Sequence, residues 1–250
     1  GDRSMSRLEF IDLSGLRLDG RRPREARQIS CKLGVCGSAD GSAVVAQGST
    51  KVVAAVYGPR ESSLKSKQLP DRASLSFEWN LAAFSTGDRK NSSKNDRRSV
   101  EMSKALRESF ETVVMTTVAP RSEIIVCVEV LQADGGERAT SFNAVTLALI
   151  DAGIPMKDML CACSAGHIDG HGVIDLSHAE DAAGGPDLCV AVMPTSGKVV
   201  HLNLEPKVPA QHLRALLDNA VAGCRQIFEE LKAEVRRKTH ERVAARGVTA

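Results

Sequence analysis

Aromatic residues are scarce in this sequence, at 3% of its 250 residues. Large rings fill many protein cores, so a core built mainly from Val, Leu, Ile and Ala is expected instead. Charge of one sign is not in excess either, since the formal net charge at pH 7 is +2. Any affinity for nucleic acid must therefore come from local basic patches and not from the field of the whole molecule.

No run of apolar residues reaches the length that spans a bilayer, and no signal peptide pattern opens the chain. Contact with a membrane is therefore not expected. Residues 1–4 precede Met5 and are interpreted as a cloning scar. The hydrophobic fraction of 42% and the charged fraction of 26% are ordinary for a globular protein.

The seven cysteines lack the two paired CxxC motifs of a zinc site. Cys161 and Cys163 alternate along one predicted strand, and most of the others also lie in apolar contexts. They are interpreted as small buried residues in a reducing compartment. The histidines at 167, 171 and 178 do not show metal-ligand spacing either, so the sequence predicts no metal site built on these residues.

Turn signals divide the chain into short β-rich runs and longer helical patterns. Strands are predicted at 28–35, 42–47, 51–57, 73–81, 124–131, 160–168, 173–176, 188–193 and 198–204. Helices are predicted from Arg97 to Pro120, from 137 to 152, and from 209 to about 235. No internal repeat or low-complexity linker is found, so one α+β domain over 5–246 is expected, with a basic tail at 236–250 that frays.

The stretch from 131 to 181 organises the chain. An apolar strand leads into Asp134-Gly135-Gly136, and a nearly all-apolar helix follows. A glycine-rich turn at a helix N-terminus suits an anion, because unpaired N–H groups and the positive end of the helix dipole point outward together. Arg138 could hold a phosphate there through two parallel hydrogen bonds. An ordinary tight connection with an exposed arginine is the alternative, and the turn by itself favours it.

Basic residues gather in two loops, at 60–67 and 84–99. Arg97 and Arg98 fall at the start of a predicted helix, where the helix dipole prefers acids. Cations gain nothing locally at that position, which favours an anionic ligand. Exposure to solvent is the alternative interpretation of any run of charge.

Two carboxylates, Asp175 and Asp181, flank a short Leu-Ser-His-Ala-Glu segment. Such a pair could hold a divalent metal or supply a general acid to a leaving oxygen. Alternatively, Asp175 is a turn residue and Asp181 lies on a solvated helix face. Spacing alone favours this second interpretation.

Several motifs together resemble the RNase PH family, and most of all its exosome ring subunits that carry the phosphorolytic site in archaea. They are LRLDGRR at 16–22, ADGSA at 39–43, LPDR at 69–72, FSTGDRK at 84–90, PRSEI at 120–124, LQADGG at 131–136, NAVTLALIDAGIPMKD at 143–158 and the DLS…EDAAGG run at 175–185. The resemblance implies an α+β fold like the second domain of ribosomal protein S5. It also implies a ring of six such domains around an RNA channel.

The resemblance also implies a role for each candidate residue. In an active member of the family, inorganic phosphate attacks the 3′-terminal phosphodiester and releases a nucleoside diphosphate, with Mg²⁺ as a possible cofactor. The implied roles are contact with RNA phosphates for Lys65, Arg97 and Arg98, binding of the attacking phosphate for Gly136 and Arg138, and an acid or metal-holding pair for Asp175 and Asp181.

One position departs from the family pattern. Active relatives carry Ser or Thr directly before the phosphate-binding arginine, whereas this chain has Glu137. A hydroxyl donates to phosphate and a carboxylate repels it. Lys65, where archaeal relatives carry Arg, is a milder departure, because the charge stays but bidentate geometry is lost.

Three hypotheses follow for the function. The first is a scaffold and RNA-channel subunit of a eukaryotic-type exosome ring, with little or no catalysis. It would assemble with paralogous ring subunits, S1/KH cap subunits, a hydrolytic nuclease and single-stranded RNA in the nucleus, nucleolus and cytoplasm. The second is a live phosphorolytic exoribonuclease in the same ring. The third is a homohexameric RNase PH that acts on tRNA ends.

Overall fold

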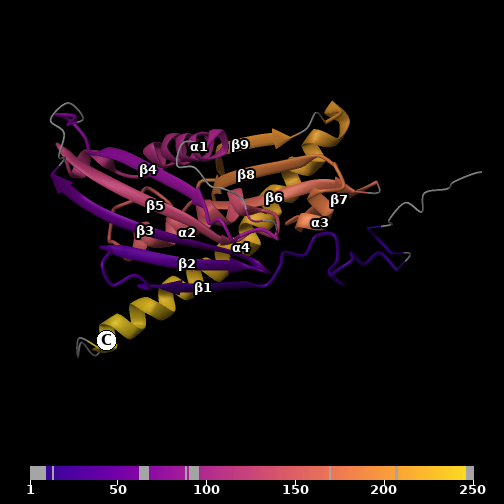
Figure 1. Ribbon diagram of the computed structural model, residues 1–250, viewed down its shortest axis with the longest axis horizontal. Helices are drawn as coiled ribbons and strands as arrows, with labels where there is room; N and C mark the ends of the chain where they lie inside the picture. Colours follow the sequence, from indigo (N-terminus) through magenta and orange to yellow (C-terminus); the bar gives the residue numbers. More distant parts are fainter. Residues whose placement is uncertain are drawn as a thin grey trace, which may run out of the picture.

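The computed structural model describes residues 10–12, 14–61, 68–87, 89, 96–168, 170–205 and 208–245. These residues form two mixed or antiparallel sheets with helices packed against them (Figure 1). The strands are β1 (Ile29–Leu33), β2 (Gly41–Gln47), β3 (Thr50–Glu61), β4 (Ser74–Leu81), β5 (Ser122–Gln132), β6 (Cys161–Ile168), β7 (His171–Ile174), β8 (Asp187–Met193) and β9 (Lys198–Glu205). The helices are α1 (Arg97–Val113), η2 (Thr116–Val118), α2 (Glu137–Asp151), α3 (His178–Asp181) and α4 (Ala210–Ala245).

The first sheet has the strand order β1-β2-β3-β5-β4. β1, β2 and β3, which correspond to the strands predicted at 28–35, 42–47 and 51–57, form an antiparallel meander. β5 pairs antiparallel with β3, and β4 pairs parallel with β5 at the edge of the sheet. Because β4 and β5 run in the same direction, their C-terminal ends lie at the same end of the sheet, and the site described below lies at that end.

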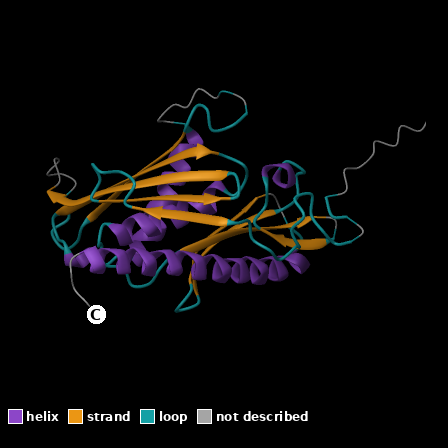
Figure 2. Cartoon of the chain, turned by 90° about the horizontal axis from the view of Figure 1, so that it is seen from below, coloured by secondary structure: helices purple, strands orange, loops and turns teal. Residues whose placement is uncertain are grey.

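The second sheet has the order β7-β6-β8-β9 and is antiparallel throughout. α4 lies across both sheets, as Figure 2 shows, and contacts strands of each. It continues to Ala245, so the segment from 236 that was expected to fray is helical as far as that residue. Ion pairs of Arg237 with Glu234 and of Arg242 with Asp151 accompany this last part. No helix in the described ranges is long and apolar enough to cross a membrane.

One hydrophobic core extends through both sheets, and α2 runs through its centre. Every residue from Ala139 to Leu149 is buried. The rings of Phe77, Phe110, Phe142 and His201 follow one another at centroid distances of 5.7, 6.0 and 5.1 Å. Aliphatic side chains supply most of the rest, as the low aromatic content predicts. Cys161, Cys163, Cys189 and Cys224 are also buried.

Two local predictions differ from the structure. α1 ends at Val113, seven residues before Pro120, because the following Val-Met-Thr-Thr-Val segment is rich in β-branched residues that lose side-chain freedom in a helix. Val114 instead bridges to Met156 in an isolated β-pair. α3 is not among the helices predicted from periodicity, since its four residues are too few to show it, although the alternative interpretation of Asp181 placed that residue on a helix.

The ring of Phe142 provides a test of this core. Phe142→Ala is expected to lower the free energy of unfolding by about 3–5 kcal/mol, because it removes a fully buried ring that contacts rings on α1 and β9. Urea denaturation measures the change. Phe84→Ala is the matched control, because Phe84 is 74% exposed and its loss should cost no more than about 0.5 kcal/mol. Equal costs for both variants would contradict this description of the core.

Candidate active site

The turn between β5 and α2 has a backbone that requires glycine at two positions. Gly135 and Gly136 both adopt left-handed conformations, with φ of 81° and 67°. A Cβ atom on Gly135 would lie 2.7 Å from the carbonyl oxygen of Leu176, and one on Gly136 would lie 3.0 Å from Nη2 of Arg27. The backbone of Leu176 and the side chain of Arg27 therefore pack tightly against this turn. It opens α2 without a side-chain cap, so the first N–H groups of the helix keep their capacity to bind.

A pocket of about 410 Å³ opens at this helix N-terminus. It brings together the start of α1, the start of α2, the segment after α3, and strands β8 and β9. Its charged lining comprises two arginines and four carboxylates, which are Arg98, Arg138, Glu137, Asp181, Asp187 and Glu205.

Arg138, predicted to bind phosphate, lies in the pocket and is already paired with acids. Its Nη2 atom is 3.1 Å from a carboxylate oxygen of Glu205 and 3.3 Å from one of Glu101. Its side chain is 17% exposed, while the two acids are largely exposed. Exposed pairs of this kind are worth little, so an incoming anion could displace them.

Glu137, the departure from the family pattern, faces the same pocket. Its Oε2 atom lies 3.3 Å from Nη2 of Arg98, and its side chain is 15% exposed. The guanidinium of Arg98 also stands over the ring of Trp79, with 5.9 Å to the ring centroid. Glu137 therefore neutralises one of the two cations that line the pocket.

Asp181, one of the two predicted carboxylates, lines the pocket together with Asp187, a residue that the sequence analysis missed. Burial raises the pKa of Asp187 to about 7, with a further contribution from the charge of Asp181. Its Oδ1 atom is buried and has no hydrogen-bond partner within the described residues. Burial also raises the pKa of Asp181, as does the charge of Glu137. Asp187 follows Asp181 by six residues, the same spacing that separates Asp175 from Asp181. This repeated spacing is the feature of the sequence that could have indicated Asp187 as a site residue.

Asp175, the other predicted carboxylate, is not brought into the pocket with Asp181. It is 1% exposed, adopts φ of 54°, and lies behind Gly136. Its carboxylate accepts hydrogen bonds from Nη2, Nε and the backbone N–H of Arg27, at 2.8, 3.0 and 2.7 Å. Burial acts to raise the pKa of Asp175, but the hydrogen bonds and charge of Arg27 outweigh it and leave the pKa lowered. Its contacts are those of a structural ion pair, and the geometry pairs Asp181 with Asp187 instead.

The short helix that carries Asp181 is held by a second buried ion pair. Arg17 donates from Nε to Oε1 of Glu180 at 2.7 Å, and both side chains are almost fully buried. Arg17 also donates to the backbone oxygens of Ile174 and Asp175. Glu180 in turn accepts from the N–H and hydroxyl of Ser177, which completes a capping box. Arg17, in the LRLDGRR motif at 16–22, therefore has a structural role at the site.

The remaining predicted residues are placed as follows. Arg97 is exposed at the first position of α1, and Arg98 lies beside it at the pocket. Lys65 lies outside the described residues. No group of three or more His, Cys, Asp or Glu side chains within the described part of the chain is arranged to hold a metal ion.

The chain belongs to the 3′ exoribonuclease family, the RNase PH family. The model of its first domain matches residues 25–155, and the model of its second domain matches residues 158–223. These matches correspond to the first sheet with α1 and α2, and to the second sheet with the start of α4. The two sheets share one hydrophobic core although the family treats them as two domains.

Named relatives include exosome proteins from animals, plants and archaea. The chain is 46% identical to exosome complex component RRP41 of Mus musculus over 95% of this chain and 97% of that protein. It is 45% identical to the Arabidopsis thaliana homologue over 94% of this chain and 97% of that protein, and 42% identical to Rrp41 of Methanopyrus kandleri over 92% and 95%.

Solved structures agree on the fold. Rice Rrp46 superimposes with a TM-score of 0.76 at 26% identity, over 88% of this chain and 100% of that chain. A chain of the Archaeoglobus fulgidus exosome with RNA bound to the active site superimposes with a TM-score of 0.75 at 21% identity, over 87% and 93%. The α+β architecture expected from the resemblance is thereby confirmed.

The raised pKa of Asp187 predicts how stability depends on pH. The folded state holds its proton up to about pH 7, whereas an unfolded Asp loses it near 3.8. Wild-type stability from this group is therefore present at low pH and is lost as pH rises through that window. Asp187→Asn removes the effect, so its stability relative to wild type should increase from about pH 4 to pH 7 and then level off. Urea denaturation of both proteins across pH measures this, and a constant difference would contradict the assignment.

The Arg17–Glu180 pair predicts a non-additive response. Arg17→Met leaves Glu180 buried without its partner and is expected to cost about 3–5 kcal/mol of unfolding free energy. The double variant Arg17→Met/Glu180→Leu removes the unpaired charge as well and should be destabilised less than Arg17→Met alone. Urea denaturation of the three proteins tests this coupling. A double variant that is less stable than Arg17→Met would rule it out.

Proposed function

We propose that this chain is a subunit of the RNA exosome core ring. In that ring the chain serves as a scaffold and RNA-channel component for 3′→5′ RNA processing and decay. It has little or no phosphorolytic activity of its own. Similarity supports the exosome role, because relatives named as exosome components match nearly the whole chain at 42–46% identity. The third hypothesis, a homohexameric RNase PH, receives no such support.

Glu137 is the observation that supports the lack of phosphorolysis. Its carboxylate lines the pocket next to Arg138 and is paired with Arg98. With Asp181, Asp187 and Glu205 also present, carboxylates outnumber arginines around the space where an inorganic phosphate would sit. The backbone N–H groups of the α2 N-terminus attract an anion, but the acids around them oppose it.

The repulsion between the carboxylates and a phosphate is larger than the attraction from the helix dipole. At about 4 Å and an effective dielectric constant of about 20, a carboxylate and one phosphate charge repel each other by roughly 4 kcal/mol. The helix dipole stabilises an acid at this position by only about 0.3–1 kcal/mol. Since about 1.4 kcal/mol is a factor of ten, phosphate affinity is lower by up to about a thousandfold than with a hydroxyl at this position.

The proposal extends to partners and location. The chain would alternate with paralogous RNase PH-like subunits in a six-membered ring, with S1/KH cap subunits and a hydrolytic nuclease attached. Single-stranded RNA would pass through the channel toward that nuclease. Arg97 and Arg98, at the start of α1, are the described candidates for contact with its phosphates, and Lys65 belongs to the same proposal. The nucleus, nucleolus and cytoplasm are the proposed locations.

Asp187 favours one alternative, a live phosphorolytic exoribonuclease. A carboxyl with a pKa of about 7 is half protonated at neutral pH and can donate a proton to a leaving oxygen. Arg138 would hold the attacking phosphate, and Asp181 would accompany Asp187 in place of the predicted Asp175. The described residues form no metal-holding group, so no step is assigned to Mg²⁺.

Release of nucleoside diphosphate by the assembled ring tests the proposal. The ring, with and without its hydrolytic partner, is given 3′-labelled single-stranded RNA in phosphate buffer. Wild type is expected to release little nucleoside diphosphate. Glu137→Thr should gain at least about tenfold, because it replaces a repelling carboxylate with a hydroxyl donor, and about tenfold corresponds to only 1.4 kcal/mol. Glu137→Thr/Arg138→Ala should lose the gain.

Glu229→Thr is the matched control, because it removes an exposed acid of α4 that pairs with Lys232. It should behave as wild type. Phosphate-dependent release by the wild-type ring that disappears in Asp187→Ala would establish the alternative function. A silent Glu137→Thr ring would show that another feature, and not Glu137, prevents phosphorolysis.

A further inference from the structure

Phe84 is displayed to solvent in a protein that buries its other rings. It is 74% exposed, the highest value among the large hydrophobic residues of the described chain. The other seven aromatic residues are buried or half-buried. An exposed ring of this size contributes little to the core, and its face is open to a ligand.

The backbone around Phe84 holds the ring at a fixed place. Ser85 donates from its N–H to the oxygen of Ala82 at 2.9 Å, which makes Phe84 the third residue of a tight turn. Ala82 donates to the oxygen of Val130 at 3.0 Å, and Ala133 donates to the oxygen of Ser85 at 2.9 Å. Ala82 and Ser85 are themselves buried. The turn is therefore fastened to the end of β5, and only the ring of Phe84 projects.

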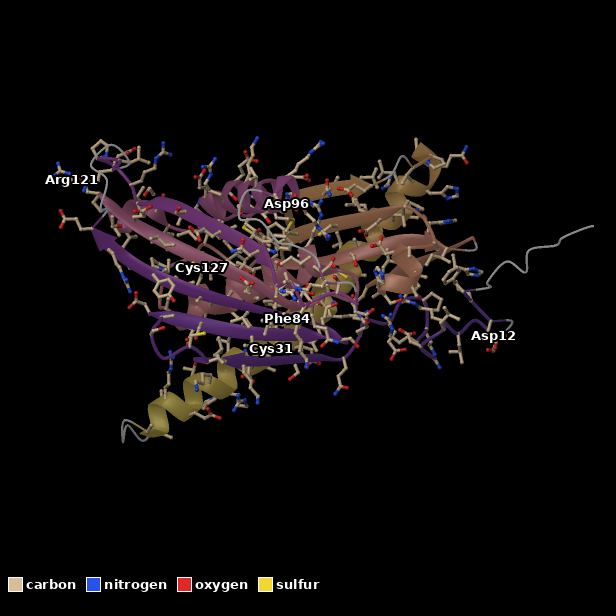
Figure 3. All side chains as sticks on the ribbon, in the orientation of Figure 1. Asp12, Cys31, Phe84, Asp96, Arg121 and Cys127 are labelled. Atoms are coloured by element: carbon tan, nitrogen blue, oxygen red, sulfur yellow. The ribbon has the colours of Figure 1, made fainter. Side chains whose placement is uncertain are left out.

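Hydrogen bonding joins this turn to the segment that leads into the pocket. Ala133, which bonds to the turn, stands three residues before Gly136, where α2 and the pocket begin. Arg98 connects the two regions, because its guanidinium stands over Trp79 of β4 and pairs with Glu137 of α2. In the view of Figure 3, Phe84 lies near the middle, where the two sheets meet in projection.

We propose that Phe84 is a nucleobase subsite, on which one base of a single-stranded RNA stacks while the arginines at the start of α1 contact the adjoining phosphates. Aromatic side chains next to cationic tracks are a general means of binding single strands, since every base offers a flat face. The ring of Phe84 would provide the flat face, and Arg97 and Arg98 at the start of α1 would provide the positive charge. The subsite rests on the proposed function, because it needs a ring that admits single-stranded RNA.

RNA binding to the assembled ring tests the subsite. Fluorescence anisotropy at one fixed salt concentration is measured with 5′-labelled single-stranded RNA, and with a series in which one nucleotide at a time near the 3′ end is abasic. Phe84→Ala should weaken binding of the intact RNA by about five- to 150-fold, the range of one base–aromatic stack. Phe84→Trp should bind as wild type does. One abasic position should abolish the difference between wild type and Phe84→Ala.

Val118→Ala is the matched control, since Val118 is 60% exposed. It lies just before the N-terminal end of β5, whereas the turn of Phe84 is bonded near the C-terminal end of that strand. The assembled complex that contains Val118→Ala should bind RNA as the wild-type complex does. Equal RNA affinity of wild type and Phe84→Ala overturns the subsite, and so does a loss that no abasic position abolishes. A Phe84→Ala chain that no longer enters the ring overturns it in favour of a subunit contact. A wild-type ring without RNA affinity overturns the proposed function together with the subsite.

Discussion

The buried ion pair between Arg27 and Asp175 is the interaction on which the site depends. Arg27 fixes both oxygens of the carboxylate and also donates to the backbone oxygens of Asp134 and Gly135. One side chain therefore joins the segment before β1 to the end of β7 and to the turn that opens α2. Desolvating two charges is costly, and the hydrogen bonds that satisfy both groups offset this cost. Removing either partner would leave a buried charge directly beneath Gly136.

The pocket next to this ion pair contains groups that attract anions and groups that repel them. The N-terminus of α2 and two arginines attract anions, while Glu137, Asp181, Asp187 and Glu205 repel them. Burial raises the pKa of Asp187 to about 7, and the charges of Asp181 and Glu205 add to the effect. A fold that suits phosphate chemistry is thus retained around a pocket whose charge disfavours phosphate. The proposed scaffold role would need the fold and would not need a pocket that binds phosphate.

Much of this could be predicted from the sequence, where the pattern was local. The alternation of strands, the two helices with long apolar stripes and the Asp-Gly-Gly turn before Arg138 all carry signals within a few residues of each other. The order of the first sheet could not be predicted, because the parallel pairing of β4 with β5 joins strands forty residues apart. Asp175 and Asp187 could not be told apart either. Which of them reaches the pocket is decided by Arg27, a partner 148 residues away from Asp175.

Direct phosphate binding is the measurement that tests the central claim most closely. Isothermal titration calorimetry of the assembled ring with inorganic phosphate, at neutral pH and low salt, reports the occupancy of the pocket without requiring turnover. The account predicts no saturable binding by wild type and saturable binding once Glu137 is replaced by Thr. Saturable binding by the wild-type ring that is lost in Arg138→Ala would contradict it, because the pocket would then hold phosphate despite its carboxylates.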